Sequence, residues 1–146
     1  MSGDPLIRLV WLVLSIAAIL AFAELARTEE PTENMPTRVF EIRTYTAEDG
    51  KLDALNARFR DHTTKLFEKH GMTSIGYWIP ADEPRSKNTL IYILAHPSRD
   101  AAKQNWEEFG KDSEWQKVKA ESEADGKLVT KVESVYVNPT DYSPLK

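Results

Sequence analysis

Residues 38–46 read RVFEIRTYT, and this stretch decides the fold. It is rich in β-branched and aromatic residues, and its side chains alternate with a period of two, which is typical of a β-strand. The alternation gives the strand two faces, one with Phe40, Ile42 and Thr44 and the other with Val39, Glu41, Arg43 and Tyr45. We therefore predict a first strand that is largely apolar on one side and carries polar groups on the other.

The segment after this strand has the spacing of an amphipathic helix. Residues 48–50 (EDG) interrupt the strand pattern, and Gly71 supplies a C-terminal stop. Between them, large apolar residues recur at helical intervals: Leu52, Leu55, Phe59, Leu66 and Phe67. We expect one helix of about 20 residues that buries this stripe.

Two strand-like stretches come next. Residues 73–79 (TSIGYWI) and 89–96 (TLIYILAH) are separated by the turn-prone residues 80–88, so they predict a hairpin with a loose loop.

The remaining pattern predicts two helices and a last strand. Ser98 can cap a helix that carries Ala102, Trp106 and Phe109 inward and stops at Gly110. Asp112 or Ser113 can cap a second short helix, which buries Trp115 and Val118. Residues 128–138 (LVTKVESVYVN) form the final strand, and residues 139–146 form an extended tail.

This order of elements favours an α+β fold with a ferredoxin-like antiparallel sheet. The helices then cover one face of the sheet and leave the other face open. Soluble monomers rarely expose a large apolar patch, and a second copy is the economical cover. We predict a homodimer in which the two sheets face each other.

Composition limits the partners and the chemistry. The 146 residues carry a net charge of −4, and their lysines are interleaved with glutamates, which argues against a nucleic-acid partner. The chain has no cysteine, so disulfides, thiolate nucleophiles and cysteine-bound metals are excluded.

The N-terminal residues have the layout of a targeting segment. Residues 1–23 combine a basic head with an uncharged apolar run that ends in the small-x-small pattern of Ala21 to Ala23, so we predict a cleaved signal peptide. Residues 24–36 are acidic and carry two prolines, as a linker does, and residues 37–146 form the domain. The alternatives are an uncleaved membrane anchor at residues 6–23 and a buried helix. The domain is then secreted or periplasmic, and it is bound to a membrane only if the leader is retained.

Several short motifs, in order, give the chain a family resemblance. They are EIRTY at 41–45, GKL at 50–52, Phe59-Arg60-x-His62, HG at 70–71, GYW at 76–78, EW at 114–115 and PTDYSP at 139–144. With these motifs the chain resembles the NIPSNAP family over about residues 37–146. The resemblance implies the dimeric α+β barrel fold. Proteins on that barrel range from cofactor-free monooxygenases and haem enzymes to binding modules, so fold alone does not choose a function. Ser113 departs from the family, which often has proline there.

The polar face of the first strand is one candidate site. Alternation aims Glu41, Arg43 and Tyr45 at the partner sheet, where they either hold a polar ligand or satisfy one another and fix the dimer register.

The three histidines are candidates for proton transfer. His62 lies at the edge of the apolar stripe, so it can point into a pocket between helix and sheet, and it is the best candidate for a catalytic base. The alternative is a partly buried histidine bonded to a neighbour. His70 suits a C-terminal capping role, and His96 ends a strand. Their spacing predicts no metal site.

Aromatic residues form a third candidate set. Trp78, Tyr92, Trp106 and Trp115 can line a pocket for a flat ligand, or they can pack in the core. Serine-elbow, phosphate-loop and nucleotide motifs do not occur, and we predict no cofactor.

These observations leave three functional hypotheses. The leading one is a homodimer that binds a small hydrophobic molecule or a protein partner. The second is a cofactor-independent oxygenase or isomerase with an enclosed pocket between the helices and the sheet, with Glu41, Arg43, Tyr45, Trp78, Tyr92 and Trp106 as ligand-binding residues in either case. The third is a membrane-tethered interaction module.

Overall fold

The structure is a computed structural model that describes residues 38–146. The predicted leader (residues 1–23), the predicted linker (residues 24–36) and the first residue of the predicted domain, Thr37, lie outside the described residues. The elements follow in the order β1 (Val39–Ala47), α2 (Leu52–Arg58), η1 (Phe59–Thr63), α3 (Thr64–Lys69), β2 (Thr73–Trp78), η2 (Arg85–Lys87), β3 (Thr89–His96), α4 (Arg99–Lys111), α5 (Ser113–Ser122) and β4 (Val129–Val137).

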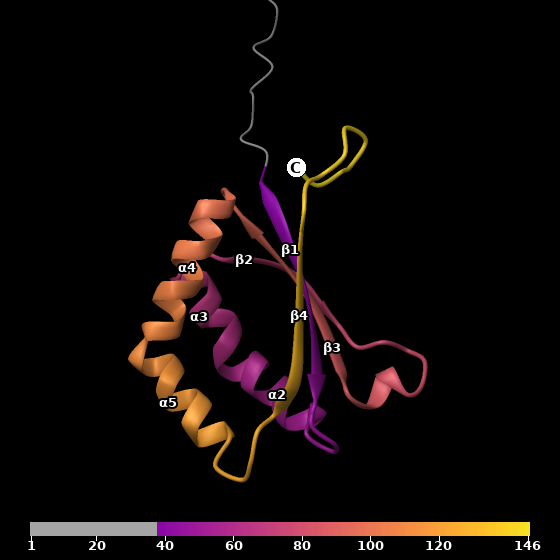
Figure 1. Ribbon diagram of the computed structural model, residues 1–146, viewed down its shortest axis with the longest axis vertical. Coiled ribbons are helices and arrows are strands. Elements are labelled where there is room, and N and C mark those ends of the chain that lie inside the picture. Colours follow the sequence, from indigo (N-terminus) through magenta and orange to yellow (C-terminus); the bar gives the residue numbers. More distant parts are fainter. Residues whose placement is uncertain (1–37) are drawn as a thin grey trace, which may run out of the picture. The chain divides into compact units, whose positions relative to one another are not determined.

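The four strands form one antiparallel sheet in the order β2-β3-β1-β4. β1 lies inside the sheet, and its Ile42 is paired with Ile93 of β3 on one side and with Val135 of β4 on the other. All the α-helices lie on one face of this sheet (Figure 1). The predicted ferredoxin-like α+β fold is confirmed.

The predicted first helix is present, with a change of winding at its centre. α2 and α3 are joined by the π-helical turn η1, and the Thr63 hydroxyl donates to the Arg58 carbonyl at 3.2 Å. Phe59 and Thr63 are the buried residues of this turn. The whole apolar stripe predicted from the sequence is buried.

The core between helices and sheet is rich in aromatic rings. Tyr92 of β3 is fully buried, and its ring centroid lies 5.2 Å from those of Tyr45 and Phe59 and 5.7 to 5.9 Å from those of Tyr77 and Phe67. Aromatic pairs at these separations are attractive beyond the area they bury. This cluster attaches the α2–α3 helix to the centre of the sheet.

Side-chain caps define where the last two helices begin. The Ser98 hydroxyl accepts from the Ala101 amide at 3.0 Å, and the Asp112 carboxylate accepts from the Glu114 and Trp115 amides at 2.7 and 3.3 Å. The predicted stop at Gly110 is wrong, because α4 continues through Lys111. Asp112 ends α4 with extended backbone because its side chain caps the next helix.

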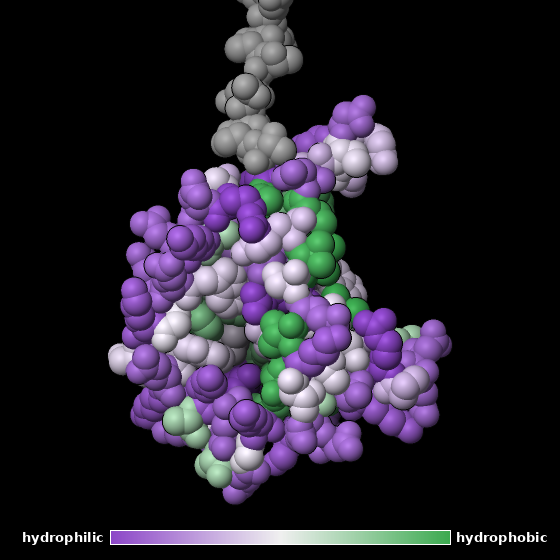
Figure 2. Space-filling view, in the orientation of Figure 1, coloured by the Kyte–Doolittle hydropathy of each residue, from purple (hydrophilic) through white to green (hydrophobic). Residues whose placement is uncertain are grey.

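The face of the sheet away from the helices is apolar toward the C-terminal tail and carries Thr44 and Glu133 farther along, and we call it the open face. Phe40, Ile42, Ile93, Val135 and Val137 share it by register. Val135 is 58% exposed. Figure 2 shows a hydrophobic band along β4 and on the side of the sheet away from the helices.

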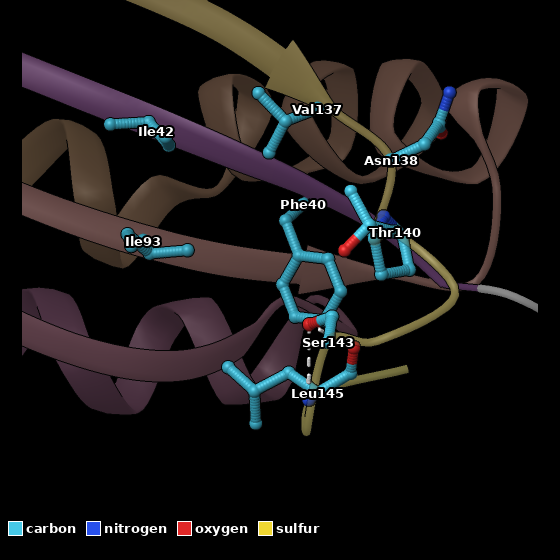
Figure 3. A pocket seen from close by; sticks show the side chains of 9 residues that line it. Phe40, Ile42, Ile93, Val137, Asn138, Thr140, Ser143 and Leu145 are labelled. Carbon is cyan, nitrogen blue, oxygen red and sulfur yellow. Dashed lines mark hydrogen bonds between the residues drawn. The ribbon is translucent and has the colours of Figure 1, made fainter.

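The C-terminal tail, residues 138–146, lies against one end of this face. The Arg38 side chain donates from Nε to the Lys146 carbonyl at 2.7 Å. Leu145 and Ser143 of the tail face Phe40 across a groove of about 290 Å³ (Figure 3). Within residues 38–146, the helices are too short or too polar to cross a membrane.

Candidate functional site

A buried carboxylate lies at the centre of a polar cluster under α4. Glu41 is 1% exposed, and each of its oxygen atoms accepts two hydrogen bonds. Oε1 accepts from Arg43 Nη1 at 2.7 Å and from the Ser134 hydroxyl at 2.6 Å. Oε2 accepts from Trp106 Nε1 at 2.7 Å and from His96 Nε2 at 3.2 Å. The cluster therefore joins three strands to the helix layer.

These contacts keep Glu41 ionised. Burial by itself raises the pKa of the carboxyl, but the hydrogen bonds from His96, Ser134 and Trp106, together with the charge of Arg43, lower the pKa to about 2. A carboxylate with such a low pKa is a poor proton acceptor at neutral pH. The arrangement is suited to holding strands and helix in register.

Arg43 extends the cluster toward the aromatic core. Its guanidinium carbon lies 4.2 Å from the centre of the Trp106 ring and 5.5 Å from that of Tyr45, within the range of cation–π attraction. Nη2 lies 3.4 Å from the Tyr45 hydroxyl. Glu41, Arg43 and Tyr45 are thus brought together, as the sequence suggested.

The direction predicted for these three side chains is wrong. They face the helices, and the apolar face with Phe40 and Ile42 is the open one. The reason is that α4 supplies the Trp106 indole as a donor for Glu41 and as an aromatic surface for Arg43. Buried polar groups require such partners, whereas the apolar face makes no demand of this kind.

The predicted aromatic set is divided between the two faces. Tyr92 and Trp106 lie in the helix-side core, where Phe67 contacts both rings. Trp78 pairs with Ile91 at the open face and is 49% exposed. These residues therefore do not form one pocket.

His62 does not point between helix and sheet, so that predicted position is wrong. It is exposed and lies at a shallow groove between α2 and α5, together with Ala54, Asp61 and Val118. Thr63, the next residue, takes the buried position on this turn of the helix.

His70 and His96 both have carboxylate partners. His96 is fully buried against Glu41, whereas His70 Nε2 lies 2.7 Å from Asp112 Oδ2. Lys69 Nζ lies 2.8 Å from the same oxygen atom. Hydrogen bonds from Lys69 and His70 lower the pKa of Asp112 well below its ordinary value. This contact ties the end of α3 to the start of α5.

Large aromatic residues occupy the space in which an enclosed pocket was expected. Phe59 contacts Tyr45 and Tyr92, Trp106 contacts Phe67 and Phe109, and Trp115 lies 4.6 Å from Phe109 between ring centroids. Of the two alternatives predicted for the aromatic residues, a ligand pocket or core packing, Tyr92 and Trp106 follow the second and pack in the core. In the part of the chain that the structure describes, no group of three His, Asp or Glu side chains is placed to hold a metal.

A groove remains between α5 and β4, and we call it the α5–β4 groove. It is bordered by residues of the helix layer and of the sheet: Tyr45, Arg58, Trp115, Lys119, Val129 and Val132. The recess is visible between α5 and β4 in Figure 2. Arg58 lies in its wall, 4% exposed, with Nη1 at 3.1 Å from Glu123 and at 3.3 Å from the Ser122 hydroxyl.

Sequence reasoning did not identify Arg58 or Ser134. Arg58 follows Leu55 by three residues, so helical spacing already placed a cation on the buried stripe, and this was the available signal. Ser134 reaches Glu41 because it lies opposite Arg43 in the β1–β4 register, which local sequence does not specify.

The sheet order and the helices on one face define a class, the ferredoxin-like α+β domain. The sequence model of the NIPSNAP family matches residues 40–144, and the chain belongs to that family.

Solved structures share this fold. A NIPSNAP family protein of unknown function from Agrobacterium tumefaciens has 23% identity and a TM-score of 0.65, covering 76% of this chain and 96% of that one. A NIPSNAP-like domain protein from Burkholderia xenovorans has 15% identity and a TM-score of 0.65, with coverages of 75% and 90%. A monooxygenase from the ActVA-Orf6 gene of Streptomyces coelicolor, in complex with nanaomycin D, shares the fold at 13% identity and a TM-score of 0.53, with coverages of 76% and 95%. No match is found among curated proteins.

Proposed function

We propose that this NIPSNAP domain binds a small hydrophobic molecule in the α5–β4 groove and works as a homodimer through its open face. The observation that carries the binding function is the groove itself, which Trp115, Tyr45, Val129 and Val132 line between α5 and β4. Ligand sites are typically concave, mostly apolar and edged by a few polar groups.

The open face supports the dimer. Val135 and Trp78 are 58% and 49% exposed, and Ile42 and Ile93 continue the same apolar surface, whereas Phe40, beside the C-terminal tail, is already buried. Facing sheets of two copies cover this surface in both at once, which suits a symmetric interface. The groove lies on the helix side of the sheet and stays accessible in such a dimer. With the leader removed, the working unit is an exported dimer.

A protein partner is the other occupant to be considered. A protein that covers the open face replaces the second copy, so the oligomeric state of the purified chain distinguishes the two. Light scattering is expected to give twice the mass of the mature chain, and the Val135→Asp variant is expected to give the monomer mass. A monomer mass for the unaltered chain at micromolar concentration refutes the dimer.

The enzyme alternative has weaker support. The monooxygenase shares the fold alone, and Phe59, Trp106 and Phe109 fill the space in which that alternative places its pocket. Glu41 is ionised and already accepts four hydrogen bonds. We therefore favour binding over catalysis.

Ligand binding can be tested with the uncharged fluorescent probe N-phenyl-1-naphthylamine, which brightens in apolar sites. We expect saturable binding that the Trp115→Ala variant weakens, because the variant removes the aromatic wall of the groove. The matched control is Trp78→Ala, which removes an indole from the open face and leaves the groove intact. Absence of binding, or equal loss in both variants, overturns the proposed site.

A further inference from the structure

Arg58 places a positive charge inside the wall of the α5–β4 groove. It comes from the last residue of α2, and its side chain is 4% exposed. Its guanidinium carbon lies 5.3 Å from the centre of the Trp115 ring, so the cation and the aromatic wall of the groove are adjacent. Charged side chains are rarely buried unless partners compensate them.

The partners of Arg58 leave part of the guanidinium unsatisfied. Nη1 donates to Ser122 Oγ and to Glu123 Oε1, whereas the buried Nε has no hydrogen-bond partner among residues 38–146. A buried donor without an acceptor is costly, and a guanidinium offers its donors in a planar fork that matches an anionic head group. Arg58 therefore keeps one buried donor without an acceptor in the described part of the chain.

The rim of the groove is mainly positively charged, like Arg58. Lys119, Lys127 and Lys131 line it, and Glu123 is its one lining carboxylate. Glu123 lies 3.1 Å from Arg58, and Lys131 is paired with Glu133 at 3.0 Å. Lys119 and Lys127 have no salt-bridge partner within the described part of the chain. After both pairs are formed, two cations remain at the mouth of the groove.

The chemistry of the walls and the rim together selects a ligand class. Tyr45, Trp115, Val129 and Val132 offer an apolar surface, and Arg58 offers charge-assisted hydrogen bonds at its inner side. We infer that the α5–β4 groove binds a hydrophobic anion, a molecule with an apolar body and one anionic head held by Arg58 and attracted by Lys119 and Lys127. This inference rests on the proposed function, because it names the ligand class of the same groove.

A pair of probes that differ only in charge tests the inference. N-phenyl-1-naphthylamine is neutral, and 8-anilinonaphthalene-1-sulfonate carries the same ring system with an anionic head. We expect the dimer of the mature chain to bind the sulfonate about tenfold more tightly, the size of one charge-assisted hydrogen bond. We also expect the preference to shrink with added salt, because the rim charges are exposed.

Variants show which residues cause the preference for the anionic probe. Arg58→Gln is expected to reduce sulfonate binding to the level of the neutral probe, and Arg58→Lys to retain part of the preference. Lys119→Gln, which leaves the core untouched, is expected to lower sulfonate affinity two- to threefold. Its control is Lys117→Gln on the same helix, since Lys117 does not line the groove and pairs with Glu121. Lys117→Gln is expected to change the affinity for neither probe.

The outcomes separate the two proposals. If neither probe binds, the proposed function fails. If both bind equally and Trp115→Ala weakens both, the groove is a ligand site and the anion inference is refuted. If Lys119→Gln and Lys117→Gln have equal effects, the recognition of charge is not local to the groove, and the inference is refuted even where Arg58→Gln does not fold.

Discussion

The indole N–H of Trp106 in α4 donates a 2.7 Å hydrogen bond to the Glu41 carboxylate in β1, across the boundary between the helix layer and the sheet. Arg43 packs on the same indole ring from the sheet side. One tryptophan therefore satisfies a buried anion and covers a cation. The position of α4 over the sheet depends on this contact as well as on apolar packing.

Replacing Trp106 with phenylalanine tests the hydrogen bond. Trp106→Phe keeps an aromatic ring but leaves Glu41 Oε2 with one donor fewer, so we expect a loss of about 1 to 3 kcal/mol in the free energy of unfolding. Urea denaturation measures it. The control is Trp115→Phe, because the Trp115 indole donates no hydrogen bond within residues 38–146. An equal loss in both variants would mean that ring volume, and not the hydrogen bond, matters.

Glu41 also predicts a pH dependence of stability. Its folded pKa of about 2 lies below its ordinary value of 4.5, so its contribution is fully present above pH 4.5 and is lost as the pH falls toward 2. Glu41→Gln removes this contribution and leaves Arg43 buried without its anion, which costs on the order of 3 kcal/mol at neutral pH. We expect the difference in unfolding free energy between the unaltered protein and Glu41→Gln to become smaller as the pH falls from 4.5 toward 2. A constant difference down to pH 2 would contradict the assignment.

Local sequence patterns were sufficient to predict the elements. The third strand, predicted at residues 89–96, is β3 at Thr89–His96, and the buried stripe of the first helix is the predicted one. Both features follow from the spacing of apolar residues along a single segment. Asp112 was also a predicted cap, because a side-chain acceptor before a helix acts on its own neighbours.

The site could not be predicted in the same way because it depends on contacts between distant segments. Alternation places Glu41 and Phe40 on opposite faces of β1, but the face that meets the helices is shown only by long-range contacts such as that of Glu41 with Trp106, 65 residues away. Ser134 reaches Glu41 from 93 residues away through the strand register. His62 was misplaced because helical spacing alone does not show that Thr63 takes the inward position.

Asp112 is the residue on which the junction between α3 and α5 depends. It caps α5 and accepts from His70 and Lys69, so Asp112→Ala is expected to lower Tm by several degrees. Asp112→Asn keeps an N-cap acceptor and removes the charge, and it should lower Tm less. Because the pKa of Asp112 is lowered in the folded state, the charge contribution is present above its ordinary pKa and is lost as the pH falls below it. Equal values of Tm for the two variants would show that the cap contributes nothing.

The leader makes a prediction about the mature chain. If residues 1–23 are a signal peptide, N-terminal sequencing of the protein exported by a secreting host is expected to begin at Glu24. Ala23→Leu removes the small residue at the cleavage position and should leave the precursor in the membrane fraction. A chain that begins at Met1 and fractionates with membranes without this substitution would support the anchor at residues 6–23 instead.

Gly76 links the open face to the proposed dimer. A Cβ atom at this position would lie 2.6 Å from Cη2 of Trp78, so Gly76→Ala must displace the indole ring. The ring is half exposed and can swing away, so we expect little change in the stability of the monomer. The contact surface does change. We therefore expect the dissociation constant of the dimer, measured by sedimentation equilibrium, to rise about tenfold, which is the effect of one misplaced interface aromatic. Gly110→Ala is the control, because a Cβ there meets nothing within 4 Å and alanine favours the helix. A dimer that is unchanged by Gly76→Ala would place the interface away from Trp78.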